Sequence, residues 1–326
     1  MNNLKKIGLS ALAGSMVAFS AQALEMSVSG QAKITYVDEG EGSAGNVDVT
    51  GNPYGFDQTV SFNGSGESPL GTVSLMHVHN ATGLSSSLLT IDMGDSGKIT
   101  LDNGVGADGA GTLKDKLPRA SGAEQAWDDT DGDAYYLDTA SGGAWGYSNT
   151  FGGVSMTVGY AKNGGGMSGD DSNIDAGSDS DKSIGLTSSV MEGMTVGYGY
   201  AETDNSTSDA GNNTEQTAFV TYAAGPVTLG YQVTDIDKEV VGGDNNSAMY
   251  GIAINMNDQA SVSYNRRDVD LADSNMGTND QEDTGIAASY TMGNMTLSAF
   301  NNTSENVGGT AGKKDEVTQV TLSFSF

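Results

Sequence analysis

From about residue 151 onward, short segments alternate apolar with small polar side chains. Met156, Val158 and Tyr160 form one such segment, with Thr157 and Gly159 between them. The same spacing recurs at Met194, Val196, Tyr198 and Tyr200; Val227, Leu229, Tyr231 and Val233; Ala260, Val262 and Tyr264; Met295, Leu297 and Ala299; and Val320, Leu322, Phe324 and Phe326. Alternation with a period of two predicts a β-strand with one apolar face. The fold then depends on what that face is buried against.

The connections between these segments alternate in length. Short ones contain residues that suit tight turns, at Gly152-Gly153, Glu192-Gly193, Gly225-Pro226, Asn257-Asp258 and Gly293-Asn294. Long ones are rich in Asp, Asn, Gly and Ser, and span residues 163–181, 204–215, 237–247, 269–283 and 303–315. A meander with its short turns at one end is typical of a transmembrane barrel, whereas a soluble sandwich has Greek-key connections.

The apolar faces are therefore predicted to meet lipid. The sheet is predicted to close, because an open edge in hydrocarbon leaves backbone donors unsatisfied. The predicted fold class is all-β, an antiparallel transmembrane barrel of about sixteen strands of roughly 8–11 residues each, with short periplasmic turns and long extracellular loops.

The first part of the chain predicts five further strands. They lie near residues 26–36, 56–62, 71–79, 89–93 and 99–101, with a tight connection over residues 63–68. The third of these has two alternative registers, because Met76 and Val78 compete with Val73 and Leu75 for the lipid face. His77 and His79 share a face of the same strand, as metal ligands could. No third ligand is placed near them, so they are interpreted as two polar residues near the outer rim.

Residues 1–23 have the pattern of a secretory signal peptide. Lys5 and Lys6 precede an apolar run from Ile7 to Ala18, and Ala21-Gln22-Ala23 is a small-x-small cleavage site. The alternative is an N-terminal membrane anchor, but the run is short and no stop-transfer sequence follows it. Residues 24–326 are then predicted to form one barrel domain.

The charge balance excludes some classes of function. The chain has 42 acidic and 14 basic residues, for a formal charge of −28, so nucleic acid is not expected as a partner. There is no cysteine, hence no thiolate metal site. Catalytic and nucleotide-binding motifs are not found in the sequence, so neither an enzyme nor an organic cofactor is predicted.

Alternation stops between about residues 103 and 143. A connection of this length is usually functional or disordered, and this one has an excess of acids. Acids at a narrow passage attract cations, so the loop is predicted to form the constriction of a pore. The predicted pore-lining residues are Asp102, Asp108, Asp115, Glu124, Asp128, Asp129, Asp131 and Asp133, with Lys33, Lys98 and Arg267 pointing inward from the strands. The alternative is that these acids are solvated surface.

Three of these acids occupy alternate positions. Asp129, Asp131 and Asp133 could supply oxygen ligands to Ca²⁺, although the order of an EF-hand is incomplete. Loose divalent bridging between acidic loops, or to lipopolysaccharide, is the alternative.

The ordered set of features resembles the Gram-negative general diffusion porins, in particular their alphaproteobacterial branch. The features are the signal peptide, the repeats Met156-Thr-Val-Gly-Tyr160 and Met194-Thr-Val-Gly-Tyr198, the long third loop and the terminal Val320-Thr-Leu-Ser-Phe-Ser-Phe326. The resemblance implies a sixteen-stranded barrel in a homotrimer, with the third loop folded into the lumen. It also implies that Phe326, with Phe324 and Leu322 on its face, signals assembly. Family pores often oppose the loop with an arginine cluster, which is sparse here.

The expected function is passive diffusion of small hydrophilic solutes through the outer membrane, with a preference for cations. Outer-membrane lipid, lipopolysaccharide and the other trimer subunits are the expected partners. One alternative is a structural or adhesive barrel with a closed lumen and partner-binding loops. Another is a soluble secreted β protein with Ca²⁺-binding loops.

Overall fold

The computed structural model describes residues 25–40, 51–132, 142–162, 180–204, 212–239, 244–271 and 279–326. The predicted signal peptide and Asp133 lie outside these ranges. Within the described part of the chain, no helix is both long and apolar enough to cross a membrane.

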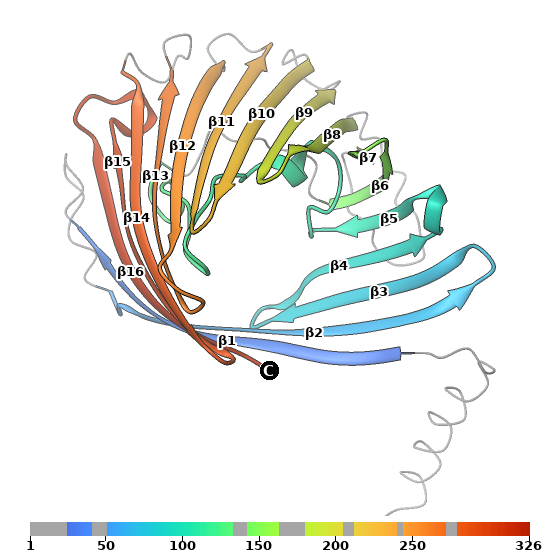
Figure 1. The fold of residues 1–326 in the computed structure, drawn as a ribbon. Coiled ribbons are helices and arrows are strands. Elements are labelled where there is room, and N and C mark those ends of the chain that lie inside the picture. The colour runs from blue at the N-terminus through green and yellow to red at the C-terminus, as the bar shows by residue number, and fades with distance from the viewer. Residues whose placement is uncertain are drawn as a thin grey trace, which may run out of the picture.

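The described residues form sixteen strands, each antiparallel to its neighbours, in one closed barrel (Figure 1). The strands are β1 Glu25–Glu39, β2 Tyr54–Ser68, β3 Gly71–Asn80, β4 Gly83–Asp92, β5 Lys98–Asn103, β6 Gly142–Phe151, β7 Val154–Lys162, β8 Ser180–Met191, β9 Met194–Asp204, β10 Asn212–Ala224, β11 Val227–Lys238, β12 Asn245–Asn255, β13 Ala260–Asp270, β14 Gln281–Met292, β15 Met295–Glu305 and β16 Lys314–Ser325. Short 3₁₀ turns are η1 Gly94–Ser96, η2 Gly109–Leu113 and η3 Val307–Gly309. The predicted fold class is confirmed.

The barrel closes where the last strand meets the first. β1 pairs with β16 from Gln31 opposite Ser325 to Glu39 opposite Val317. The C-terminal residue extends this seam: Phe326 N–H donates to Gly30 O at 3.0 Å, and Gly30 N–H donates to Phe326 O at 2.7 Å. The first and last strands are therefore joined from Gly30 to Glu39, as hydrocarbon surroundings require, while residues 25–29 of β1 pair with β2 alone.

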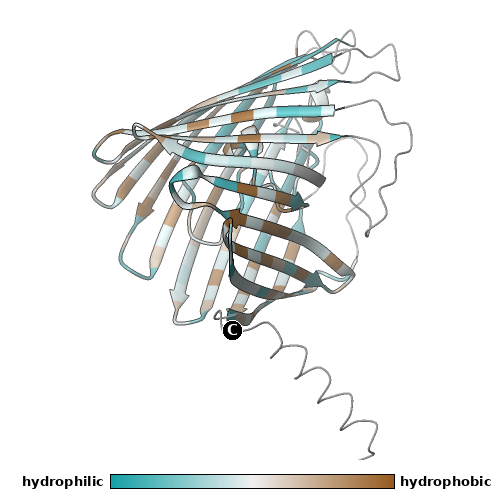
Figure 2. Cartoon of the chain, turned by 90° about the vertical axis from the view of Figure 1, so that its right-hand side faces the viewer, coloured by the Kyte–Doolittle hydropathy of each residue, from teal (hydrophilic) through white to brown (hydrophobic). Residues whose placement is uncertain are grey.

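The two faces of the barrel have opposite chemistry. Large apolar side chains on the outer face are exposed, among them Val28 at 65%, Phe56 at 66% and Ile286 at 58%. Many inward positions are polar, and Gln232 and Thr217 are buried there. Figure 2 shows the resulting alternation of brown with white or teal blocks along the strands. This inversion of the soluble pattern is typical of a barrel whose outer face meets lipid.

The predicted tight connection over residues 63–68 is wrong. β2 continues to Ser68, and the chain turns only at residues 69–70. Asn63 to Ser68 lack apolar alternation, but all of them pair with β3, and Asn63 to Ser65 also pair with β1, which supplies their backbone hydrogen bonds. Small polar residues here therefore form a strand through pairing and not through a buried face.

The structure decides the register of β3. Leu75 lies opposite Gly64, which lies opposite the exposed Met26, so Leu75 and Val73 face outward. Met76 lies opposite Asn63 on the inward face. β3 and β4 are joined by residues 81–82 alone, at the end of the barrel where the other connections are long.

An arginine on the outer face should cost far more than one on the water-facing side. We expect Ile286→Arg in β14 to lower the free energy of unfolding by about 2–4 kcal/mol, because a charge near the bilayer midplane is poorly solvated. The control Thr59→Arg places the same side chain on the inward face of β2 and should cost less than about 1 kcal/mol. Urea unfolding in lipid vesicles, followed by gel mobility without heating, measures both. Equal losses would contradict the assignment of the faces.

Candidate functional site: a loop folded inside the barrel

The segment after β5 turns into the barrel at two carboxylates. Asp102, at the end of β5, accepts the N–H of Val105 at 2.7 Å and the N–H of Ala107 at 2.5 Å. Asp108 accepts the hydroxyl of Thr100 at 2.6 Å. A Cβ at Gly146 would overlap the Asp108 carboxylate, so this approach needs glycine. Burial raises the pKa of Asp108. Both acids therefore fix the start of the loop and are nearly inaccessible to water in the lumen.

The next part of the loop packs against β7, β8 and β9. The Gly109 carbonyl, in η2, accepts the hydroxyl of Thr157 at 3.0 Å. Gly109 has φ 63° and no room for a Cβ beside Ser183, which explains why glycine stands there. Ala110 and Leu113 are buried against the wall at Gly199. The 3₁₀ turn is thus seated directly on the inner face of the barrel.

A single glutamine holds the middle of the loop to β11. Gln232 is fully buried, and its side-chain amide donates to Leu113 O at 2.8 Å and to Lys114 O at 3.0 Å. Its carbonyl accepts the N–H of Lys116 at 3.0 Å. Burial lowers the pKa of Lys116.

The next segment of the loop packs over two glycines of the wall and is hydrogen-bonded by side chains of β13. Leu117 and Pro118 lie over Gly230 and Gly251, where any larger side chain would push them off the wall. Asn265 donates to Pro118 O at 2.9 Å. The hydroxyls of Ser263 and Ser261 accept backbone N–H groups of the loop at 2.9 Å and 3.1 Å.

The far end of the loop is held by a buried ion pair. Arg267 Nε lies 2.7 Å from Asp283 Oδ2, and both side chains are inaccessible to solvent. The Arg267 guanidinium also donates to Gly132 O at 2.7 Å and lies 4.7 Å from the centre of the Trp127 ring. Ser304 donates to the other oxygen of Asp283 at 2.6 Å. The pair is therefore desolvated but fully hydrogen-bonded, which is the condition for a buried ion pair to persist.

Asn302 in β15 completes this attachment. Its amide donates to Gln125 O at 2.7 Å and to Asp128 O at 3.0 Å. The loop therefore lies along the inner wall from β7 to β15, inside the ring of strands in Figure 1.

Several predicted pore-lining residues lie elsewhere than expected. Arg267 does point inward, but the loop covers it, so it holds the loop and does not face water: this is a correction to the prediction. Asp102 and Asp108 are corrected in the same way, because both are buried: Asp102 accepts N–H groups of the loop, and Asp108 accepts the hydroxyl of Thr100 in β5.

The other predicted residues stay partly accessible. Asp129 and Asp131 are exposed, and Asp115 and Asp128 are half-buried. Glu124 is 41% exposed and lies 3.9 Å from Arg119. Asp131 lies 3.4 Å from the Lys313 Nζ. Lys33 and Lys98 point inward from the strands that the loop does not cover.

Sequence reasoning missed the residues that hold the loop, chiefly Trp127, Gln232, Asp283 and Asn302, with Gln281, whose side-chain amide donates to Gly132 O at 3.0 Å. Most inward positions carry small side chains, so large amides and carboxylates at inward positions of β11 to β15 were the signal available. Trp127 is one of two tryptophans in the chain and lies in an otherwise polar loop.

A model of the Gram-negative porin family matches residues 8–326. The chain belongs to that family. It is an outer-membrane diffusion channel with short turns at the periplasmic end and long loops outside, the connection between β3 and β4 excepted. The resemblance drawn from the sequence is confirmed. No curated protein matches the chain significantly.

Solved structures of porins share the fold. A porin refined at 1.8 Å resolution is 15% identical with a TM-score of 0.66, over 93% of this chain and 100% of that one. A triple mutant of the Rhodopseudomonas blastica porin is 13% identical with a TM-score of 0.62, over 93% and 100%. The anion-selective porin from Comamonas acidovorans is 16% identical with a TM-score of 0.60, again over 93% and 100%. At such identities the likeness concerns the fold.

Loss of the buried arginine should loosen the loop of this porin. We expect Arg267→Met to lower the free energy of unfolding by about 3–5 kcal/mol, because Asp283 would stay buried without its counter-charge. Open-channel current noise should rise, because residues 125–132 lose one attachment. Single-channel recording and urea unfolding measure the two effects.

The matched control is the neighbouring Arg266→Met. Arg266 points to the outer face, where it pairs with Asp268 and Glu282 at 2.8 Å and 2.6 Å. Its loss should cost about 1 kcal/mol or less and leave the noise unchanged. A second variant, Arg267→Met with Asp283→Leu, should recover part of the stability. Unchanged noise in Arg267→Met would contradict the role assigned to this ion pair.

Proposed function

We propose that this porin passes small hydrophilic solutes by diffusion and prefers cations over anions. The observation that carries the proposal is the excess of negative charge around the lumen, since Arg267 is buried beneath the loop and does not face the water. Besides the buried Asp108, the described loop residues include five acids that stay partly accessible, Asp115, Glu124, Asp128, Asp129 and Asp131, and three bases, Lys114, Lys116 and Arg119. Fixed negative charge at a narrow passage raises the local concentration of cations.

The part of the barrel wall that the loop does not cover also favours cations over anions. Lys98 Nζ lies 2.8 Å from Asp92 Oδ2. Lys33 lies directly opposite Asp57 on the inward face of β1 and β2. Each inward lysine of this wall therefore has a carboxylate beside it, so the wall offers anions little attraction.

Solved relatives do not supply the sign of the preference, since one of them is described as anion-selective. The sign must come from the residues of this chain. A weak transverse field also follows, because few inward bases oppose the acidic loop.

Zero-current potentials in a KCl gradient across a planar bilayer test the proposal. We expect a potential of the cation-selective sign that grows as salt is lowered, because the Debye length lengthens from about 10 Å at 0.1 M to about 30 Å at 0.01 M. A combined Glu124→Gln, Asp128→Asn and Asp129→Asn variant should move the potential toward zero. The control Asp235→Asn removes an acid from the outer face and should leave it unchanged. An anion-selective potential in the unaltered protein would overturn the proposal.

The same recordings separate this function from an adhesive barrel with a closed lumen, which would show no ohmic steps. We also propose that the porin is a homotrimer in contact with outer-membrane lipid and lipopolysaccharide, on the strength of the family resemblance. Light scattering of the detergent-solubilised protein tests the trimer. Calcium binding at Asp129, Asp131 and Asp133 stays a prediction, because Asp133 lies outside the described residues.

A further inference from the structure

The two histidines of the chain lie side by side on β3. His77 and His79 are two residues apart, so they share a face of the strand, and that face is the outer one. Their Nε2 atoms are 3.1 Å apart, and the ring centres are 4.9 Å apart. Among the hydrogen bonds of the described residues, each imidazole has the other as its partner. The pair therefore forms a compact nitrogen cluster on the outside of the barrel.

The surroundings of the pair are unlike the rest of the lipid-facing wall. His77 lies opposite Phe62 and His79 opposite Val60, so two polar rings interrupt an apolar surface. The register of β3 with β4 shifts between Val78 and His79, where β4 has one extra residue, Ser85. His79 is exposed and lies beside the turn at residues 81–82, close to the polar end of the wall.

We propose that His77 and His79 together bind one divalent transition-metal ion on the outer face of β3. Two nitrogens bound to one ion at about 2.0–2.1 Å lie about 2.9 Å apart at a right angle and about 3.4 Å apart in tetrahedral geometry. The separation of 3.1 Å between the Nε2 atoms falls inside that range. Small rotations of the rings would turn both nitrogens toward a shared ion.

The chemistry of the pair limits the kind of ion. Imidazole nitrogen suits Cu²⁺, Ni²⁺ and Zn²⁺, whereas Ca²⁺ and Mg²⁺ prefer oxygen ligands. No group of three or more His, Cys, Asp or Glu side chains that could hold a metal occurs among the described residues. The remaining coordination positions would therefore be taken by water or by an anionic group from outside the chain. A rigid strand holds both ligands in place, which favours chelation despite the small number of ligands.

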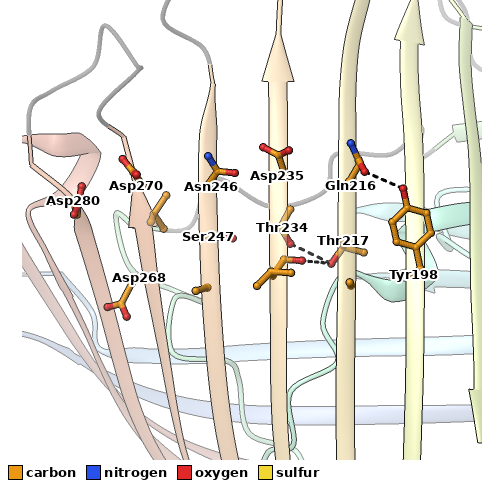
Figure 3. A pocket seen from close by; sticks show the side chains of 14 residues that line it. Tyr198, Gln216, Thr217, Thr234, Asp235, Asn246, Ser247, Asp268, Asp270 and Asp280 are labelled. Atoms are coloured by element: carbon orange, nitrogen blue, oxygen red, sulfur yellow. Dashed lines mark hydrogen bonds between the residues drawn. The ribbon is translucent and has the colours of Figure 1, made fainter. Parts of the chain in front are cut away.

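The site is separate from the pore. Its ligands face away from the lumen, while the acids of the loop and the lysines of the uncovered wall face into it. Metal binding should therefore leave conductance unchanged. Acids on the outer ends of β11 to β14 offer a competing place for cations, and Figure 3 shows Asp235, Asp268 and Asp270 there, next to a cavity of about 500 Å³.

Titration calorimetry of the untagged, detergent-solubilised porin with ZnCl₂ tests the proposal. A large excess of Mg²⁺ is present throughout, to occupy sites made of carboxylates. We expect one Zn²⁺ per chain, and binding weakened about 10²-fold in His77→Asn and in His79→Asn, because either change removes chelation. Asp235→Asn should bind as the unaltered protein does. Single-channel conductance of each variant confirms that the barrel has folded.

A second measurement needs no variant. Cu²⁺ added in equal amount should give an electron paramagnetic resonance spectrum with hyperfine splitting from two equivalent imidazole nitrogens. Absence of Zn²⁺ binding, a Cu²⁺ spectrum with oxygen ligands alone, or full binding by a His77→Asn and His79→Asn double variant would each overturn the proposal.

Discussion

Complete backbone hydrogen bonding within one closed sheet is the constraint on which this structure depends. In hydrocarbon an unpaired N–H or C=O costs several kcal/mol, so the first and last strands must find each other. The pairing of β1 with β16, extended by Gly30 and Phe326, meets that requirement. Once the sheet is closed, alternation assigns every second side chain to lipid and the others to an interior that must be filled with water or with protein. The loop is the protein that fills part of it.

Filling the interior with protein also buries charged side chains, and at the far end of the loop two of them are paired with each other. Arg267 and Asp283 would each be costly to bury alone, but together they neutralise each other. Gly132 and Ser304 supply further hydrogen bonds to the pair, and the Trp127 ring lies against the guanidinium. Withdrawing this arginine from the water leaves the lumen with lysines that already have carboxylate neighbours. Mechanical support of the loop and the sign of the field in the pore therefore depend on the same side chain.

The sequence predicted the strands well wherever lipid exposure demands apolar side chains at alternate positions. It failed at Asn63 to Ser68, because pairing alone makes a strand there and leaves no periodic signal. It assigned Arg267 to the correct face, but periodicity says nothing of what covers a face, so its burial could not be predicted. The register of β3 stayed open for a similar reason, since Val73, Leu75, Met76 and Val78 make both faces equally apolar. Contacts between the loop and strands more than a hundred residues away leave only a faint trace, the large amides and carboxylates at inward positions of β11 to β15, which does not say which loop residue each one meets.

Those distant contacts also set an order of events during biogenesis. The hydrogen bonds of Gln125 and Asp128 to Asn302 join residues 177 and 174 positions apart. The loop cannot reach them until β15 stands in the wall, although it leaves the chain after β5. The attachments to Asn302 therefore need β15 in the wall, whereas those of η2 to β7, β8 and β9 need only the strands that follow the loop directly in the chain.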